Sequence, residues 1–549
     1  MGTWYLKPIR GSAAVVKLGK GKVSIGRHPD NVVPITDDLS SRFHCEIEEV
    51  SAGTFVLKDL GSKNGTKVNE AKVMESKLKA GDVIRVGHHE FLLENDLVPD
   101  DSAGLSDSAI EAAEGSLVTN ADANPMAWTA TINEMIENLP PKSSVLPEVT
   151  IIDSSGKPSQ ALSGSSDGPA AVRLLLHASL KARSTDVHIE PKQETYHTRF
   201  RVDGQMITIV ELPMRVGELF FGLIKAACAM RVAGRDAVLE GHFSAKFGER
   251  RVEYRVSFTP SVYGQKLVLR VLDTMNAPGS LTEMGMAGYM VDRVRRTCAQ
   301  DHGMFLTCGP TGSGKTTSLY NALREIDREA RNVVTIEDPV EYQLDNITQI
   351  PIDEGKGNTF GGLLRSVLRQ DPDVILVGEI RDDETARTAM QAAMTGHLVF
   401  STVHAKDTIS AIFRLLDLKV EPFLVANSLD LVIAQRLVRQ LCDHCKRSVP
   451  VAPGVSTRLG KFMGGKSEMY VSTGCPRCLR TGYRGRRAIF ELLEFNDDLR
   501  DVVLKSPTIA DIKRIIEQGL FTTLAQFGWR LVAEGTTTLE EVDRVAGQG

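Results

Sequence analysis

The sequence predicts a multidomain chain in which a β-sandwich precedes two α/β domains. Its 549 residues exceed what one hydrophobic core organises. The first hundred residues form short runs of alternating polarity separated by Gly, Asn and Asp turns, which is typical of a sandwich. Farther along, an apolar run over 303–308, a glycine-rich loop and a helical pattern over 318–326 follow one another, which indicates a strand, a loop and a helix of an α/β domain.

The overall composition is that of an ordinary water-soluble protein. Hydrophobic residues make up 42% and charged residues 25%, and 65 basic against 70 acidic residues leave a formal charge of −5. This balance predicts no nucleic-acid partner. The N-terminus lacks the apolar core of a signal peptide, and no run is long enough to span a membrane. We therefore expect a cytoplasmic protein.

Residues 1–97 carry three turn motifs: Gly26 with Arg27, the run 41–44, and the run 61–66. A phosphate on a loop needs a guanidinium and hydroxyl or amide donors, which these turns contain. The order and spacing resemble a forkhead-associated (FHA) domain, a phosphothreonine reader, over almost the whole segment. The resemblance implies a phosphopeptide site made of Arg27, Ser41, Arg42, Ser62 and Asn64. A degenerate scaffold that binds nothing is the alternative.

Residues 98–168 are predicted to be a flexible linker. The segment is rich in Ala, Ser, Asp and Glu, and later in Pro, Ser and Gly, with few large apolar residues. Such a tether lets the FHA module sample a wide volume and raises the effective concentration of whatever it holds. Within it, helical spacing of apolar residues over 126–139 predicts a short docking helix.

A middle domain is predicted over 169–278. An amphipathic helix over 170–182 leads into strand-like runs at 184–191, 196–204, 252–258 and 264–270. These runs resemble the second N-terminal domain of the secretion-type motor ATPases, the GspE/PilB family of type II secretion and type IV pilus assembly. The resemblance implies a PAS-like α/β domain that packs over the nucleotide and contributes arginines to its phosphates.

The matching positions for phosphate contacts are Arg201, Arg255 and Arg270. Cations at this place suit the charge that develops during phosphoryl transfer. The alternative is that each is an exposed strand arginine. The sequence departs from the family in one respect, because the basic run expected near 233–242 is thinned to few arginines.

The glycine-rich run 309–317 has the complete GxxxxGKT pattern of a P-loop, or Walker A motif, with a strand before it and a helix after it. Successive backbone N–H groups face a polyphosphate, Lys315 reaches its β and γ oxygens, and the Thr316 hydroxyl ligates Mg²⁺. The motif therefore predicts an ATP and Mg²⁺ site; a glycine turn with a chance lysine is the alternative. The predicted nucleotide contacts are Gly309, Pro310, Thr311, Gly312, Ser313, Gly314, Lys315, Thr316 and Thr317.

Two later apolar strands end in carboxylates, Glu337 and Glu379. Ligand chemistry sits at the carboxyl ends of strands in open α/β sheets. The resemblance implies that Glu337 is the catalytic base and Glu379, in an atypical Walker B strand, the metal-side residue, and the reverse assignment stays open. His397 and His404 bracket another apolar strand and match the family's histidine box, which implies γ-phosphate sensing; packing is the alternative.

Four of the eight cysteines form two CxxC pairs, Cys442 with Cys445 and Cys475 with Cys478. Two such knuckles complete a closed tetrahedral Zn²⁺ site, whereas a redox pair, which is the alternative, needs only one. The spacing matches the tetracysteine insertion of the same family. We expect a RecA-like ATPase domain over 279–549, with this zinc module at 436–487 and a helical tail at 495–549.

The resemblance as a whole implies a homohexameric ATPase motor with an FHA domain in front. Such a motor couples ATP hydrolysis to pseudopilus or pilus assembly, or protein secretion, at the inner membrane, where it is peripherally bound to a platform protein. The FHA domain implies regulation through a phosphothreonine-containing protein. Two alternatives are a RecA-like ATPase that translocates nucleic acid and an FHA adaptor scaffold with a silent nucleotide site.

Overall fold

The computed structural model describes residues 4–95, 127–230 and 237–547, with short gaps at 11–15, 19–20, 29, 36, 38, 52–53, 70, 142–146, 160–161, 163, 165, 506 and 520. The chain divides into two compact units, Met1–Ser106 and Asp107–Gly549. Among the described residues, no helix is both long and apolar enough to cross a membrane.

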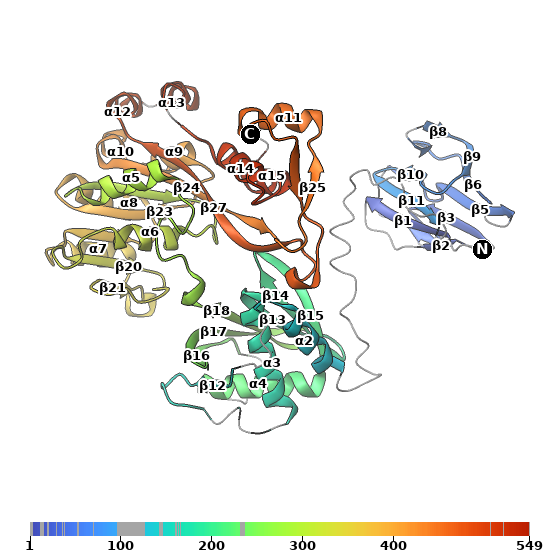
Figure 1. Ribbon diagram of the computed structural model, residues 1–549, viewed down its shortest axis with the longest axis horizontal. Helices are drawn as coiled ribbons and strands as arrows, with labels where there is room; N and C mark the ends of the chain where they lie inside the picture. The colour runs from blue at the N-terminus through green and yellow to red at the C-terminus, as the bar shows by residue number, and fades with distance from the viewer. Residues whose placement is uncertain are drawn as a thin grey trace. The chain divides into compact units, whose positions relative to one another are not determined.

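The first unit is a β-sandwich, drawn in blue in Figure 1. Inward-facing residues of both sheets, such as Ile25, Leu57 and Phe91, are fully buried, because alternate side chains of each strand point into the core. One sheet has the order β2-β1-β11-β10-β7-β8 and the other β4-β3-β5-β6-β9. The strands are β1 (Trp4–Arg10), β2 (Val16–Leu18), β3 (Lys22–Gly26), β4 (Val33–Pro34), β5 (Cys45–Ser51), β6 (Thr54–Asp59), β7 (Thr66–Val68), β8 (Ala71–Val73), β9 (Glu75–Leu78), β10 (Val83–Val86) and β11 (His89–Asn95).

The second unit begins with a seven-stranded antiparallel sheet of order β12-β16-β17-β18-β13-β14-β15. Its strands are β12 (Val149–Ile152), β13 (Ser184–Pro191), β14 (Thr195–Val202), β15 (Gln205–Pro213), β16 (Leu239–Phe247), β17 (Arg250–Ser261) and β18 (Gly264–Leu272). The helices α3 (Asp167–Ala182) and α4 (Met214–Ala227) cover one face, over buried residues such as Phe200 and Tyr254. The opposite face carries every second side chain of the strands, and most of these side chains are polar.

Part of the expected linker is built into this middle domain. The helix α2 (Ala127–Asn138) forms where the apolar spacing predicts one, and its Trp128, Ile132 and Ile136 join the same core as α3. Strand β12 also lies within the expected linker and pairs with β16. Burial of these apolar side chains offsets the entropic cost of ordering the segment. The Pro, Ser and Gly content of the neighbouring residues gives no indication of this burial. The stretch 98–126 lies outside the described residues.

The C-terminal domain is built on a second seven-stranded sheet, β21-β20-β22-β23-β19-β24-β27, parallel except for β27. Its strands are β19 (Gly303–Cys308), β20 (Val333–Glu337), β21 (Thr348–Pro351), β22 (Val374–Val377), β23 (Leu398–Val403), β24 (Leu429–Leu441) and β27 (Tyr483–Glu494). Strands β19, β20, β22 and β23 are buried at every position, as continuous apolar runs in a parallel sheet are.

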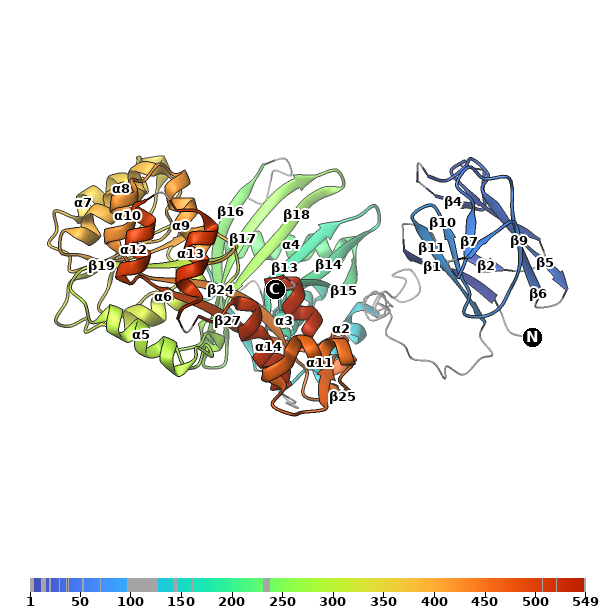
Figure 2. The same cartoon turned by 90° about the horizontal axis from the view of Figure 1, so that it is seen from above.

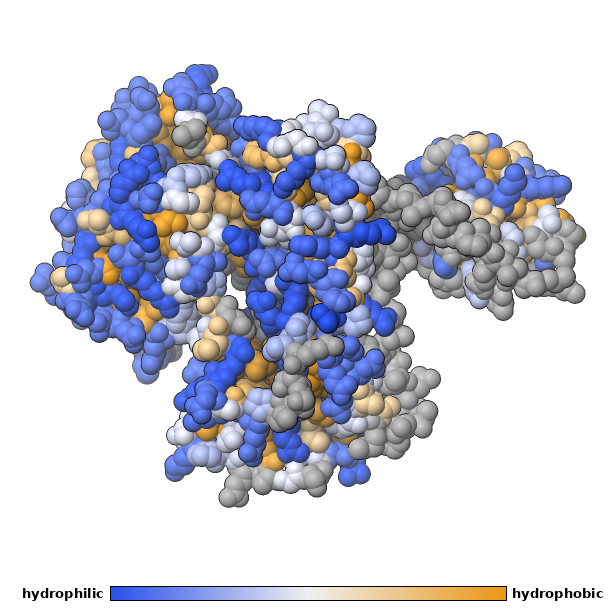
Figure 3. Space-filling view, in the orientation of Figure 1, coloured by the Kyte–Doolittle hydropathy of each residue, from blue (hydrophilic) through white to orange (hydrophobic). Residues whose placement is uncertain are grey.

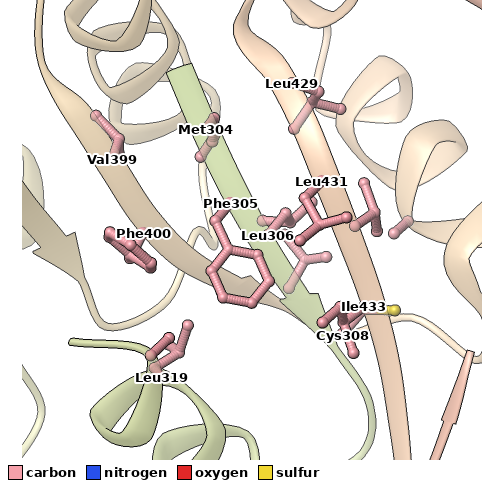
Figure 4. Close-up of a cluster of buried hydrophobic side chains, with 14 of the residues drawn as sticks. Met304, Phe305, Leu306, Cys308, Leu319, Val399, Phe400, Leu429, Leu431 and Ile433 are labelled. Atoms are coloured by element: carbon pink, nitrogen blue, oxygen red, sulfur yellow. The ribbon is translucent and has the colours of Figure 1, made fainter. Parts of the chain in front are cut away.

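Helices cover both faces of this sheet, as the view in Figure 2 shows. On one face lie α5 (Gly288–Cys298) and α6 (Lys315–Arg324), and on the other lie α7 (Phe360–Val367), α8 (Asp383–Met394), α9 (Thr408–Asp417) and α10 (Pro422–Ser428). Phe305 of β19 packs edge-on against Phe400 of β23 and lies near Leu319 of α6, which fixes the phosphate-loop helix onto the central strands (Figure 4).

The remaining elements complete the C-terminal part. A two-stranded sheet of β25 (Arg447–Pro450) and β26 (Glu468–Val471) lies between the cysteine pairs with α11 (Pro453–Leu459), and four helices follow: α12 (Asp497–Leu504), α13 (Ile509–Ile516), α14 (Leu524–Ala533) and α15 (Leu539–Ala546). Leu459 and Met469 pack with Val532 and Val542 of α14 and α15 in a small core of their own. Hydrophilic residues cover most of the face seen in Figure 3.

Candidate functional site

The P-loop curls between the end of β19 and the start of α6. Gly309 allows a close approach, because a Cβ there would lie 2.5 Å from Ser313 Oγ and 2.7 Å from Gln435 O. Gly314 has φ +88° and a Cβ there would meet Gln435 Nε2 at 2.8 Å, so only glycine fits without strain. The Ser313 hydroxyl is buried, with no hydrogen-bond partner among the described residues. The loop thus leaves a helix N-terminus and polar groups oriented for an anion.

Lys315 is the first residue of α6 and folds back over the loop. Its ammonium donates to the carbonyl oxygens of Gly309 at 2.9 Å and Pro310 at 3.2 Å. Burial lowers the pKa of the Lys315 ammonium, while the negative charge of Glu379 acts in the opposite direction. Lys315 and Glu379 are therefore brought into one electrostatic neighbourhood, although 63 residues of sequence separate them.

Glu379 follows β22 and is held by two basic side chains. His404 Nε2 lies 2.8 Å from Glu379 Oε1, and Arg381 Nε donates to Glu379 Oε2 at 2.8 Å. The Glu379 side chain is 15% exposed and that of His404 is 50% exposed. His404 follows β23, which lies between β22 and the P-loop strand. Glu379, His404 and Lys315 are thus grouped at the carboxyl ends of three neighbouring strands, where a nucleotide would bind.

Glu337 is the last residue of β20 and is only 4% exposed. Its carboxylate accepts hydrogen bonds from the hydroxyl of Tyr320, from Thr335 Oγ1 at 2.5 Å and from Gln349 Nε2 at 3.1 Å. Since β20 lies beside β22, Glu337 and Glu379 occupy adjacent strand ends, as the sequence predicts. Their surroundings differ: Glu337 is enclosed by neutral donors, and Glu379 by cationic groups.

His397 is separated from this group, contrary to the expectation of a γ-phosphate sensor. It precedes β23, and the parallel register pairs Leu398 with Gly303 and Val403 with Cys308. His397 therefore lies at the amino edge of the sheet, and the P-loop leaves the carboxyl edge, a whole strand away at about 3.3 Å per residue. There its Nδ1 lies 3.1 Å from the Ala392 carbonyl oxygen.

The three middle-domain arginines lie in one row across the open face of the sheet. Arg201 lies opposite Asp186, Asp186 opposite Arg270, and Arg270 opposite Arg255. Arg201 and Arg270 both pair with Asp186, at 3.6 and 3.2 Å. Within the described part of the chain, no hydrogen bond or ion pair joins them to the P-loop. Arg255 and Arg270 line a polar groove of about 770 Å³ on this face.

Among the contacts of the described residues, Arg255 is the one of the three that reaches the C-terminal domain. Its Nη2 donates to Val340 O at 2.7 Å, and its Nη1 lies 3.6 Å from Glu341 Oε2, in the segment directly after Glu337. A second cavity, of about 370 Å³, lies between the two domains and is lined by Gly314 and Thr317 of the P-loop together with Arg183 and Asp203 of the middle domain. Gly314 and Thr317 therefore face the middle domain across this cavity.

The four cysteines of the CxxC pairs converge in space. Their Sγ atoms lie within 4.8 Å of one another, with Cys442 to Cys475 at 3.9 Å, Cys445 to Cys478 at 3.8 Å and Cys475 to Cys478 at 3.7 Å. Tetrahedral Zn–S bonds of about 2.3 Å place sulfurs about 3.8 Å apart, whereas a disulfide needs about 2.05 Å. Backbone N–H groups of Cys475 and Gly482 donate to Cys478 Sγ. The donor set fits a structural zinc ion.

The sandwich brings its phosphopeptide candidates to neighbouring loops. The backbone N–H of Arg27 donates to Ser41 O at 3.0 Å, the N–H of Lys63 donates to Ser41 Oγ at 3.0 Å, and Asn64 Nδ2 donates to Leu39 O at 2.7 Å. Beneath them His44 is fully buried and accepts the Ser41 N–H on Nδ1 at 3.1 Å. Burial lowers the pKa of His44, so it braces the loop as a neutral ring.

Ser62 and Arg42 are placed differently from the other candidates. The Ser62 hydroxyl donates to Asp59 Oδ2 at 2.6 Å and accepts from the Gly65 N–H at 2.9 Å, so it serves the loop itself. Arg42 is exposed, and its carbonyl oxygen accepts from His28 N and Asn31 Nδ2. The structure therefore groups Arg27, Ser41 and Asn64 and turns Ser62 inward.

Several residues that sequence reasoning did not single out join these sites. Tyr320 and Gln349 contact Glu337, Arg381 contacts Glu379, and the Lys63 N–H contacts Ser41. Lys63 lies between two candidates in the sequence and Arg381 lies two residues after Glu379, so closeness in the sequence could have indicated both. Tyr320 and Gln349 carry no such signal, because their role depends on how α6 and β21 pack against β20.

A glycine-rich phosphate loop on a central strand of a parallel sheet, with glutamates at the ends of two adjacent strands of the same sheet, defines a RecA-like P-loop ATPase. Comparison with known proteins specifies the class further. The chain belongs to the family described as type II/IV secretion system protein, whose model matches residues 168–544. It is accordingly an ATPase. The FHA domain model matches residues 23–87, which makes the N-terminal sandwich an FHA domain.

Individual relatives agree with this assignment. The type II secretion system protein E of Pectobacterium carotovorum is 41% identical over 374 residues, covering 68% of this chain and 74% of that protein. The type IV pilus assembly ATPase PilB of Myxococcus xanthus is 38% identical over 380 residues, covering 68% and 66%. The fold of the second unit resembles the ATPase DotB of Legionella pneumophila, with a TM-score of 0.53 at 19% identity, covering 69% of this chain and 96% of DotB.

Proposed function

We propose that this chain is a cytoplasmic motor that couples ATP hydrolysis to pseudopilus or pilus assembly, or to protein secretion, at the inner membrane. The observation that carries the proposal is the convergence of Lys315, Glu379 and His404 at the carboxyl edge of the motor sheet, in a chain of the type II/IV secretion family. The partner we propose at the membrane is the platform protein of the secretion or pilus apparatus.

In the proposed reaction the P-loop N–H groups and Lys315 hold the β and γ phosphates, which requires the ammonium to leave the loop carbonyls. Glu337 accepts a proton from water as the oxygen bonds to the γ phosphorus and the bond to the β,γ-bridging oxygen breaks, which releases ADP and phosphate. Glu379, oriented by His404 and Arg381, and the Thr316 hydroxyl would hold a Mg²⁺ ion here. Mg²⁺, when bound, neutralises the developing phosphate charge.

We propose that the chain acts as a homohexamer in which Arg201, Arg255 and Arg270 approach a nucleotide across the protomer boundary. Support comes from their position on the open sheet face, where the side chain of Arg270 is 62% exposed. A zinc ion held by Cys442, Cys445, Cys475 and Cys478 would be structural, because four thiolates leave it no open position for chemistry.

We propose further that the FHA domain binds a phosphothreonine-containing protein and so recruits it to the motor. Arg27 supplies charge, and the Ser41 hydroxyl, which accepts the Lys63 N–H, keeps its own proton to donate to a phosphate oxygen. Asn64, held by Leu39 O, is placed to contact the peptide backbone.

The test is the Mg²⁺-dependent ATPase activity of the full-length chain. We expect Lys315→Ala to reduce turnover to background and to weaken nucleotide binding, because charge on the β and γ oxygens is lost. Glu379→Gln keeps the shape of the side chain and should retain bound ATP without turnover. The matched control is Lys356→Ala, since Lys356 is an exposed lysine that pairs with Asp353. Wild-type turnover in Lys315→Ala or Glu379→Gln contradicts the proposal.

A further inference from the structure

The Glu337 carboxylate is buried and accepts hydrogen bonds from three side chains. The side chains that donate to it are Tyr320, Thr335 and Gln349, and all three come from different elements: α6, β20 and β21. Tyr320 and Thr335 are themselves fully buried. A carboxylate out of water is costly unless hydrogen bonds replace its hydration, so these donors determine where its oxygens point.

Tyr320 links this carboxylate to the phosphate loop. It lies on α6, the helix that begins at Lys315, and its hydroxyl donates to Glu337 Oε2. The Tyr320 ring is fixed by an edge-on contact with Tyr342, with centroids 4.7 Å apart, and Gln349 Nε2 donates to its hydroxyl oxygen at 3.3 Å. A single rigid helix therefore carries both the phosphate-binding lysine and the group that orients Glu337.

We propose that Tyr320 is a positioning residue for ATP hydrolysis, which acts by fixing the Glu337 carboxylate relative to the phosphate loop. This rests on the proposed function in which Glu337 is the base. One oxygen, Oε1, is occupied by Thr335 and Gln349, and Tyr320 holds the other, Oε2, which keeps a second lone pair for water. Fixing a base in this way contributes to the rate without contributing to nucleotide affinity.

The same network reaches the middle domain. Gln349 Nε2 also donates to Tyr342 O at 3.2 Å. Between Glu337 and Tyr342 in the sequence, Val340 O accepts a hydrogen bond from Arg255 of the middle domain at 2.7 Å. The middle domain thus contacts the segment that connects Glu337 to Tyr342. Tyr320 is the point at which this segment meets the P-loop helix.

The experiment compares Tyr320→Phe with Tyr342→Phe in the full-length chain. Tyr320→Phe keeps the ring and deletes only the donor, so we expect kcat to fall roughly tenfold to a hundredfold, the effect of losing one charge-assisted hydrogen bond, with KM for ATP changed less than about twofold. Tyr342→Phe removes a hydroxyl from the neighbouring ring, which is not among the donors to Glu337, and should leave kcat within about twofold.

A double variant separates this inference from the proposed function. If Tyr320 acts through Glu337, Tyr320→Phe combined with Glu337→Gln is no slower than Glu337→Gln alone. Wild-type kcat in Tyr320→Phe, a parallel rise in KM, or additive losses in the double variant overturn the positioning role. Turnover near wild type in Glu337→Gln overturns the base assignment itself. Should Tyr320→Phe not fold, Gln349→Met, which removes the amide that contacts both groups, must show the same loss of kcat at constant KM.

Discussion

At the scale of single residues, the two histidines of the predicted histidine box are chemically alike but differently placed. His404 leaves β23 at the carboxyl edge and contacts Glu379, and His397 enters the same strand at the amino edge. A strand of six residues separates them, so one ligand cannot contact both.

This separation predicts a contrast between two alanine variants. His404→Ala removes a group that orients Glu379 and should lower kcat by roughly tenfold or more, in the range of groups that orient catalytic side chains. His397→Ala removes a contact to Ala392 O at the amino edge of the sheet and should leave kcat within about twofold, which makes it the matched control. Steady-state ATPase assays on both variants provide the measurement; equal losses would contradict the placement.

At the scale of elements, the cysteine module is a junction between the C-terminal and middle domains. Leu479, directly after Cys478, packs against the core of the middle domain. Arg484 donates to Pro140 O at 3.0 Å, beyond the end of α2, and the Gly485 N–H donates to Asp203 Oδ2 at 2.7 Å. These three residues follow the second knuckle closely in the chain, so the cysteine cluster and the domain contact are adjacent.

Removal of a bound metal ion should therefore destabilise α2, a helix that is far from the cysteines in the sequence. Structural zinc contributes folding free energy directly, so chelation, or Cys445→Ser, should raise the hydrogen-exchange rate of α2 amides and of the turn at Asp203. Exchange in β19 and β23, which lie in the main core of the C-terminal domain, should change little. Re-addition of Zn²⁺ to the chelated protein restores protection and serves as the control. Unchanged α2 exchange in protein shown to be metal-free would refute the junction role.

At the scale of the whole molecule, the chain consists of two compact units, each with its own core. The FHA loops and the P-loop lie on different units, and the sequence between the units is poor in large apolar residues. We expect phosphopeptide binding by the FHA domain and ATP hydrolysis by the second unit to be separable functions. The tether would connect them by raising the local concentration of the bound partner.

This expectation is tested by measuring two properties of one variant. Arg27→Ala should weaken binding of phosphothreonine peptides from a degenerate library by roughly tenfold to a hundredfold, since a charge-assisted hydrogen bond is lost. ATP turnover of the full-length Arg27→Ala chain should equal that of the wild type. Arg85→Ala, on β10 beside Glu90, is the matched control for loss of an arginine. Altered turnover, or binding indifferent to Arg27→Ala, would contradict the separation.

The sequence by itself determined the parts of this protein whose chemistry is contained in contiguous residues. The P-loop needs nine neighbouring residues between a strand and a helix, each CxxC knuckle needs four, and the FHA loops are short runs in a definite order. Strand-end glutamates were also predictable, because a buried apolar run ending in a carboxylate places that carboxylate at the functional edge of a parallel sheet. Local backbone geometry determines all of these features.

Only the tertiary structure decided which of these groups meet. Tyr320 with Glu337, His404 with Glu379 and Arg255 with Val340 are contacts between elements that are 17 to 85 residues apart. The incorporation of α2 into the middle domain and the separation of His397 from the P-loop edge of the sheet also depend on tertiary packing. Strand order and helix packing depend on which distant side chains are buried against one another. The local periodicity of the sequence does not indicate which partners these are.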